Sequence, residues 1–210
     1  MNDEIPIIEH DDHFYNERII QRNWGRLILG LFPRIKVYLF QAYCRHVARS
    51  HGATVGKYSV IPYSLAKKAN KNLIVGEHCC ISTSDIDLRA KVEIGNYVAF
   101  SRTVRILRAS HDVDSPLFTT LYYDLKIDDY VWLVGCLILP RVTHIACGAV
   151  CGCGSVVTRN VPEMALVGGN PAQELRKRKC VASAYCLEDL RGGDFPRYWQ
   201  CLKTKWKNRS

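Results

Sequence analysis

Residues 127–161 read IDDYVW LVGCLI LPRVTH IACGAV CGCGSV VTRNV when they are cut into blocks of six. The first position of the blocks is apolar throughout: Ile127, Leu133, Leu139, Ile145, Cys151 and Val157. The fifth position is small or apolar: Val131, Leu137, Thr143, Ala149, Ser155 and Val161. An α-helix repeats near 3.6 residues and a strand repeats near two, so this period predicts a chain that turns a corner every six residues. Such a pattern is typical of a β-helix built from hexapeptide coils.

The same period extends toward the N-terminus. It is carried by Val55, Ile61, Val75, Ile81, Leu88, Ile94, Phe100 and Ile106. An ordinary set of parallel strands with coincidental spacing is the alternative, but residues 125–161 contain no helix-length stretch of period 3.6. Ile127 comes three residues later than a coil of three six-residue steps from Ile106 would place it. We therefore expect a bulge of three residues there, and it would hold Ser110-His111-Asp112.

The segments on either side of the repeats differ in composition. Residues 1–17 are acidic, and residues 18–58 combine cations with apolar residues at helical intervals. Pro33 would divide the latter into two helices, because proline lacks the backbone N–H of a helix interior. We expect an all-β solenoid over residues 55–168 with a catalytic loop at 107–126, preceded by an acidic N-terminus and basic helical cap (1–54). Residues 169–210 would form a coenzyme-contacting segment and a helical tail.

Neither a membrane span nor an export signal is expected. No run of about 18 apolar residues is present, and the N-terminus is acidic. The sequence contains ten cysteines, but no paired CxxC spacing. We therefore predict a cytoplasmic protein whose cysteines are reduced thiols that pack as small apolar side chains.

Most of the net charge of +9 comes from residues 18–58, which contain no acid. A basic amphipathic helix pair indicates peripheral contact with a membrane surface, here the inner membrane, or with another anionic partner. A cap that seals the open end of the solenoid is the alternative, and both roles are compatible. No recognition motif or repeated aromatic platform accompanies the charge, so nucleic-acid binding is not expected.

Several motifs follow the helical segment in a characteristic order. They are Ser110-His111-Asp112, Val131-Trp132-Leu133-Val134, residues 154–162 (GSVVTRNVP), Gly169-Asn170-Pro171-Ala172 and Arg176-Lys177-Arg178. In order and approximate spacing, residues 23–179 resemble the bacterial hexapeptide-repeat acetyltransferases. The similarity is greatest to the colanic-acid-type polysaccharide O-acetyltransferases, with galactoside and maltose acetyltransferases as wider relatives.

The resemblance implies a left-handed parallel β-helix that forms homotrimers, with each acetyl-CoA site between two subunits. It implies no metal. The residues that match the family's coenzyme groove are Gly135, Cys153, Thr158, Arg159, Arg176 and Arg178. Relatives often have Lys at the position of Arg159, and Ala or Gly at that of Cys153, so the thiol would narrow the channel.

Acyl transfer to a hydroxyl needs a base, because an alcohol must lose its proton during attack. His111 matches the family's catalytic histidine, and an imidazole accepts a proton near neutral pH. An acidic residue would orient this ring, and we select Asp87 from Asp85, Asp87, Asp112 and Asp114. By the resemblance, Ser82 would bind the acceptor, and Trp132 would lie beside the acceptor or the acyl group.

The expected function is O-acetylation of a sugar hydroxyl, in a surface polysaccharide precursor. A small acceptor, such as an antibiotic or an amino sugar, and a non-catalytic solenoid scaffold are the alternatives. A γ-type carbonic anhydrase of this fold would need three histidines on one zinc ion, and His111 has no histidine partner in its loop.

Overall fold

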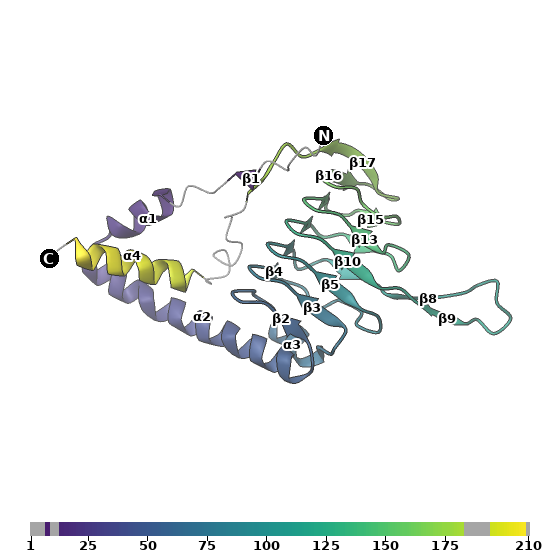
Figure 1. Cartoon of the computed structure of the whole chain (residues 1–210), viewed down its shortest axis with the longest axis horizontal. Helices are drawn as coiled ribbons and strands as arrows, with labels where there is room; N and C mark the ends of the chain where they lie inside the picture. Colours follow the sequence, from purple (N-terminus) through teal and green to yellow (C-terminus); the bar gives the residue numbers. More distant parts are fainter. Residues whose placement is uncertain (1–6, 9–12, 183–193, 209–210) are drawn as a thin grey trace.

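The computed structural model describes residues 7–8, 13–182 and 194–208, and its body is a stack of coils made of short β-strands (Figure 1). The chain passes through three parallel sheets in turn. The first sheet contains β2 (Thr54–Val55), β3 (Leu73–Val75), β5 (Val92–Ile94), β10 (Leu125–Ile127) and β13 (His144–Ile145). The second contains β4 (Cys80–Ile81), β6 (Ala99–Phe100), β11 (Trp132–Leu133), β14 (Val150–Cys151), β16 (Ala165–Gly168) and the antiparallel β17 (Gln173–Lys177). The third contains β7 (Arg105–Ile106), β12 (Leu137–Ile138) and β15 (Val156–Val157).

Equivalent apolar side chains of successive coils lie above one another inside the stack. Val75 pairs with Ile94, Ile94 with Ile127, and Ile127 with Ile145, and all four residues are buried. Each coil therefore shields the apolar side chains of the next coil from water, and the stack is held together by these contacts. The predicted parallel strands are present, and Ile145 pairs with Ile127 after three steps of six, as the period requires.

The six-residue step changes at Leu139, which the sequence pattern assigned to the buried column. Ile138 is fully buried, whereas Leu139 is only half-buried. The step from Leu133 to Ile138 takes five residues, and the step from Ile138 to Ile145 takes seven. The prediction for Leu139 is wrong because the step that contains the corner at Pro140 is one residue longer than six. The step before it is one residue shorter, so the overall period is kept.

The excursion that carries His111 is longer than the predicted three residues. Ile94 in β5 pairs with Ile127 in β10, and this coil is far longer than the coil from Val75 to Ile94 or the coil from Ile127 to Ile145. The extra residues form a hairpin, β8 (Ala109–His111) and β9 (Thr120–Tyr122), that projects from the coils (Figure 1). We call residues 109–122 the arm. The prediction is wrong because Ile106 and Ile127 are separated by a single step from the third sheet to the first, not by a whole coil.

The predicted division of the N-terminal helix is also wrong. α2 (Trp24–Ser50) is one continuous helix with Pro33 inside it. Proline removes the N–H that would donate to the carbonyl of Leu29, but Leu29 is exposed, so water can reach that carbonyl. At its N-terminus, the side chain of Asn23 accepts from the N–H of Arg26 at 2.9 Å, which caps the helix.

The C-terminal part of α2 covers the first coil together with α3 (Tyr63–Lys68). Cys44 and Ala48 of α2, and Leu65 of α3, belong to the same buried core as the coils. Arg45 is also buried there, and its Nη1 donates to the carbonyl of Ser59 at 3.1 Å. A terminal coil needs such a cover because one of its sides has no neighbouring coil. This part of the helical segment therefore shares its core with the first end of the coils.

The N-terminal part of α2 belongs to a second, smaller core. α1 (His13–Ile20) and α4 (Phe195–Lys207) pack against it around Ile19, Leu27, Tyr198 and Cys201. The hydroxyl of Tyr198 donates to the carbonyl of Leu27 at 2.9 Å, and Nε of Arg34 donates to Asp194 at 2.7 Å. The predicted helical tail is thus present, and it packs against a helix that is distant from it in sequence. The strands β1 (Ile7–Ile8) and β18 (Val181–Ala182) pair in parallel.

Among the described residues, α2 is the helix whose length and composition would suffice to cross a membrane. The expectation that no such helix exists is too strict, because it requires an uninterrupted apolar run. Arg34 and Lys36 interrupt the run without removing the apolar character of the helix.

Several cysteines pack as small apolar side chains, as expected. Cys44, Cys136 and Cys151 are buried. Burial raises the pKa of the Cys147 thiol to about 11, so this thiol is protonated at neutral pH.

Candidate active site

The arm leaves the stack at the corner between the third and first sheets. Its strands are antiparallel, with Ala109 opposite Tyr122 and His111 opposite Thr120. The N–H of Tyr123 donates to the carbonyl of Arg108 at 2.9 Å, which closes the base of the arm. His111 is therefore held by a backbone ladder, and its position is fixed relative to the coils.

The side chain of Arg108 anchors the arm to the coils. It is fully buried, and its Nη1 and Nη2 donate to the carbonyls of Val142 and Leu139, each at 2.7 Å. Burial lowers the pKa of this guanidinium to about 10, so it is still cationic at neutral pH. Nothing in the sequence pattern identifies Arg108, because the pattern does not show which carbonyls the side chain reaches.

The tip of the arm is a pair of nested turns. The N–H of Asp112 donates to the carbonyl of Thr119, and that of Phe118 donates to the carbonyl of Ser115, each at 2.9 Å. Phe118 has a φ of 49°, a left-handed conformation that is uncommon outside glycine. This conformation turns the carbonyl of Phe118 back toward the strand that carries His111.

His111 is held in one orientation by this turn. Its Nδ1 lies 3.0 Å from the carbonyl oxygen of Phe118 and 3.4 Å from Oγ1 of Thr120. Its ring stacks on the ring of Phe118, with centroids 4.5 Å apart and planes inclined by 10°. A carbonyl oxygen only accepts hydrogen bonds, so Nδ1 carries the hydrogen of the neutral ring. The other nitrogen, Nε2, is then a proton acceptor on an exposed side chain.

Asp87 lies at the same corner as the base of the arm, and its partners are arginines. Its carboxylate accepts from Nε and Nη2 of Arg89 at 2.9 and 2.8 Å, and from the N–H of Arg108 at 3.2 Å. The hydrogen bonds from Arg89, assisted by the N–H of Arg108, lower the pKa of Asp87 to about 2. These contacts join Asp87 to the base of the arm and not to the ring of His111. Its predicted role in orienting that ring stays a prediction.

Three other predicted residues line the corner between the second and third sheets. Ser82, Gly135 and Cys153 follow β4, β11 and β14. The N–H of Gly135 donates to Oγ of Ser101 at 2.7 Å, and its φ is 54°. A Cβ on Gly135 would lie 2.8 Å from Oγ1 of Thr103 and 3.2 Å from Sγ of Cys153. The close approach of three coils therefore requires glycine, and the exposed Cys153 lies beside it.

Thr158 and Arg159 lie at the corner of the arm instead. They follow β15, and Arg159 is exposed whereas Thr158 is half-buried. The N–H of Leu139 donates to the carbonyl of Val157, which aligns this corner with the coil that supports Arg108. Within one chain, these predicted site residues thus fall into two groups, on the two corners that flank the third sheet.

The remaining predicted residues lie elsewhere. Arg176 is exposed on β17. Nη1 of Arg178 donates to the carbonyls of Tyr130 and Gly148 at 3.2 and 2.9 Å, near the corner between the first and second sheets. Burial lowers the pKa of Arg178. Trp132 is half-exposed on β11. Their roles toward coenzyme and acceptor stay predictions.

In the part of the chain that the structure describes, no group of three or more His, Cys, Asp or Glu side chains is suited to hold a metal ion. His144, which lies on the first sheet, pairs with Asp128 at 2.7 Å.

No family model matches the chain. The chain is 29% identical over 154 residues to an Escherichia coli protein provisionally named colanic acid biosynthesis acetyltransferase WcaF, covering 72% of this chain and 81% of that protein. It is 36% identical over 88 residues to the galactoside O-acetyltransferase of Lactococcus lactis, covering 40% and 42%. It is also 36% identical over 92 residues to a Schizosaccharomyces pombe protein provisionally named an acetyltransferase, covering 42% and 44%. The chain spans less than half the length of the latter two.

Among solved structures, a hexapeptide-repeat-containing acetyltransferase of Vibrio cholerae superposes with a TM-score of 0.55 at 24% identity, covering 77% of this chain and 98% of that one. A structure of the same Vibrio protein contains acetyl coenzyme A, and it superposes with a TM-score of 0.48 at 22% identity, covering 80% and 89%. The three parallel sheets and the relatives by sequence lead to one conclusion. The chain has the fold of a hexapeptide-repeat-containing acetyltransferase, and it is similar in sequence to proteins named as acetyltransferases.

Proposed function

We propose that this protein transfers the acetyl group of acetyl coenzyme A to a hydroxyl group of a sugar, with His111 as the general base. The observation that carries the proposal is the hydrogen bond from Nδ1 of His111 to the carbonyl of Phe118, because it leaves Nε2 as an exposed proton acceptor. The names of the relatives support the reaction class. Two of these names also refer to saccharides, colanic acid and a galactoside.

The proposed reaction uses this geometry. Nε2 of His111 accepts the proton of the sugar hydroxyl while the hydroxyl oxygen attacks the thioester carbon. The tetrahedral intermediate then expels the coenzyme sulfur, which takes the proton from Nε2 and leaves as a thiol. The products are the acetyl ester and free coenzyme A, and His111 returns to its neutral form. Phe118 keeps its hydrogen bond to Nδ1 throughout, so the ring need not turn between the two proton transfers.

The coenzyme would lie along the corner of Gly135 and Cys153. A pantetheine arm is narrow and extended, and the close packing around Gly135 leaves no room there for a larger side chain. The exposed guanidinium groups of Arg159 and Arg176 would meet the phosphates, since guanidinium groups bind phosphate well. Thr158 and Arg178 complete the set proposed from the resemblance.

A complete site would require a second copy of the chain. The arm projects away from its own coils (Figure 1), and it exposes Val113, Leu117 and Tyr122 to solvent. These apolar side chains would be covered if the arm lay against a neighbouring subunit. We propose a homotrimer in which the arm of one subunit brings His111 to the Gly135 corner of the next. This arrangement would unite the two groups of predicted residues.

The acceptor is proposed to be a sugar in a surface polysaccharide precursor. Trp132 is half-exposed on β11, so its face is available to a sugar ring, and Ser82 lies on the coenzyme corner two coils earlier in the chain. The name of the E. coli relative supports this acceptor class.

The resemblance also supports two further parts of the proposal. We propose that the coils wind as a left-handed β-helix, although general chirality rules favour right-handed crossovers. Because acetyl coenzyme A is a metabolite of the cell interior, we propose a cytoplasmic location.

The decisive experiment measures release of the coenzyme thiol by wild type and by His111→Ala over a panel of sugar acceptors. The expected result is a loss of kcat of about 10²- to 10⁴-fold in the variant. Binding of coenzyme A, measured by calorimetry, should change little, because His111 acts on the hydroxyl proton. His51→Ala is a matched control: its Nδ1 also contacts a carbonyl, that of Val47 at 2.8 Å, and it lies far from the arm.

Equal turnover by wild type and His111→Ala would remove His111 as the base. Failure of the wild type to bind coenzyme A would overturn the enzymatic proposal as a whole. Turnover with small antibiotic or amino-sugar acceptors, but with none of the polysaccharide precursors, would replace the proposed acceptor.

A further inference from the structure

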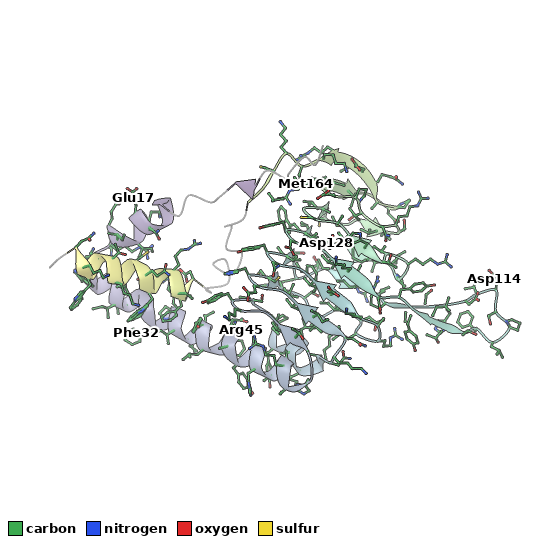
Figure 2. The ribbon with its side chains drawn as sticks, in the orientation of Figure 1. Glu17, Phe32, Arg45, Asp114, Asp128 and Met164 are labelled. Atoms are coloured by element: carbon green, nitrogen blue, oxygen red, sulfur yellow. The ribbon has the colours of Figure 1, made fainter. Side chains whose placement is uncertain are left out.

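One side of α2 is apolar and exposed. It faces away from α4, as Phe32 shows in Figure 2. Its large apolar side chains have exposed fractions between 39% and 71%, counting one tyrosine of α3 that stacks on α2. We define the apolar strip as Ile28, Leu29, Phe32, Leu39, Phe40, Tyr43 and Tyr63.

Helical periodicity makes the strip continuous. Ile28 and Phe32 are four residues apart, as are Leu39 and Tyr43, and Leu39 follows Ile28 after close to three full turns. The strip thus covers one side of the helix along its length. The opposite side of α2 is already covered, because Leu27 and Cys44 are buried in the two cores.

The surroundings of the strip are cationic. Lys36 lies in the same row as Phe32 and Phe40, four residues from each. Nζ of Lys67 is 5.5 Å from the ring centroid of Tyr63. Residues 18–76 contain 11 Arg and Lys and no Asp or Glu, and residues 195–208 contain four and none. An apolar strip surrounded by cations is complementary to a surface that is both apolar and anionic.

We propose that the apolar strip docks on an anionic lipid bilayer, with α2 lying in the plane of the interface. The apolar side chains would enter the boundary between headgroups and acyl chains, while Lys36 and Lys67 would meet the lipid phosphates. A spanning orientation would place Arg34, Lys36 and Arg45 in hydrocarbon, which is costly. A second copy of the chain is a poor occupant, since two strips face to face would bring like charges together.

The test is co-sedimentation of the full chain with vesicles. At low salt, the wild type should bind vesicles of phosphatidylcholine with phosphatidylglycerol, and should bind pure phosphatidylcholine at least about tenfold more weakly. Leu29→Ser/Phe32→Ser/Phe40→Ser should lose binding to the anionic vesicles by about tenfold or more. Leu175→Ser is a matched control, because Leu175 is equally exposed but lies on β17 at the other end of the coils. It should bind as the wild type does.

Three outcomes would overturn the proposal. They are absence of wild-type binding to anionic vesicles at low salt, unchanged binding by the triple variant, and a smaller oligomer of the triple variant in lipid-free solution, which would assign the strip to a second copy. Circular dichroism checks that the triple variant folds. None of these measurements uses enzymatic turnover, so the proposal stands or falls independently of the proposed function.

Discussion

Two side chains fix the base of the arm, and they use opposite charges to do so. Arg108 donates to carbonyls of the coil that contains Leu139, while Asp87 accepts the backbone N–H of Arg108. The residue that carries the arm is therefore held through its side chain and its backbone at once. We expect the position of His111 to depend on both contacts.

Arg108→Met should lower the free energy of unfolding by about 2–4 kcal/mol. Methionine is apolar, so the buried carbonyl of Val142 would lose its donor, while the carbonyl of Leu139 would keep only the backbone N–H of Val142. Urea unfolding followed by circular dichroism measures the change. Arg105→Met is a suitable control, because Arg105 is exposed and pairs with the exposed Asp85. A loss below about 1 kcal/mol for Arg108→Met would contradict the anchoring role.

Asp87→Asn should change the pH dependence of stability. The pKa of Asp87 is about 2 in the folded chain, below its value in an unfolded chain, so its charged form stabilises the fold at neutral pH and this contribution is lost as the pH falls toward 2. Near neutral pH, the free energy of unfolding of the wild type should exceed that of Asp87→Asn by about 1 kcal/mol. The difference is small because Arg89 is exposed, so solvent screens its interaction with Asp87. Urea unfolding between about pH 6 and pH 3 should show the difference shrinking with acidity. A difference that is constant over this range would refute the assignment.

The family resemblance selects His111 and Gly135 as site residues, and their roles stay predictions. The role of Arg108 is not predicted, because its partners are backbone carbonyls that are distant in sequence. The contact of Phe118 with His111 is not predicted either, because it depends on the unusual φ of Phe118. The sequence does not show which backbone carbonyls accept these hydrogen bonds, since every residue has a carbonyl.

At the scale of the element, the coils owe their spacing to close backbone contacts at the corners. A Cβ on Gly76 would lie 2.5 Å from the carbonyl oxygen of Gly95 and 2.6 Å from Oδ1 of Asn96. Neither atom is the end of a long flexible side chain. The corner after β3 therefore accepts only glycine without a shift of the next coil.

Gly76→Ala should destabilise the protein by about 1–3 kcal/mol, as overpacking in a core does. Gly25→Ala is the matched control, since the nearest atom to a Cβ there is 3.9 Å away on the exposed start of α2. That variant should be neutral or more stable by up to about 1 kcal/mol, because alanine favours a helix. Thermal unfolding compares the two. Equal melting temperatures would show that the coils separate at little cost.

The elements that follow the strict period are predictable, and the departures from it are not. The inward column is correct at Ile127, Leu133 and Ile145 but fails at Leu139, because a five-residue step and a seven-residue step cancel and leave the overall period intact. The length of the arm is misjudged for a related reason. A period alone does not say which sheet a strand enters.

At the scale of the whole molecule, the chain has two cores joined by one helix. The coils need covering at their first end, and the C-terminal part of α2 provides it, while the N-terminal part of α2 gathers α1 and α4. The tail at residues 195–207 thus returns to the beginning of the chain. Its helical character is readable from sequence, but its partner is not, since nothing local links Tyr198 to Leu27.

Mixed trimers test whether the site lies between subunits. His111→Ala removes the base from the arm, and Cys153→Trp would block the coenzyme corner, so each homotrimer should be inactive. If the arm of one subunit serves the corner of the next, about a quarter of the sites in a one-to-one mixture contain neither change. Thiol release after co-refolding should recover to about that fraction of wild type. If activity stays absent in the mixture, the arm serves its own chain.

The direct pairing of Ile94 with Ile127 also shows that the coils are continuous beneath the arm. The coils on either side of the arm contact each other as if the hairpin were missing, and the bond from Tyr123 to Arg108 brings its two ends together. Such an insertion can be exchanged, lengthened or deleted in a gene without disturbing the scaffold that receives it. The arm is in this sense a separable part of the fold, because the coils beneath it pair without its help.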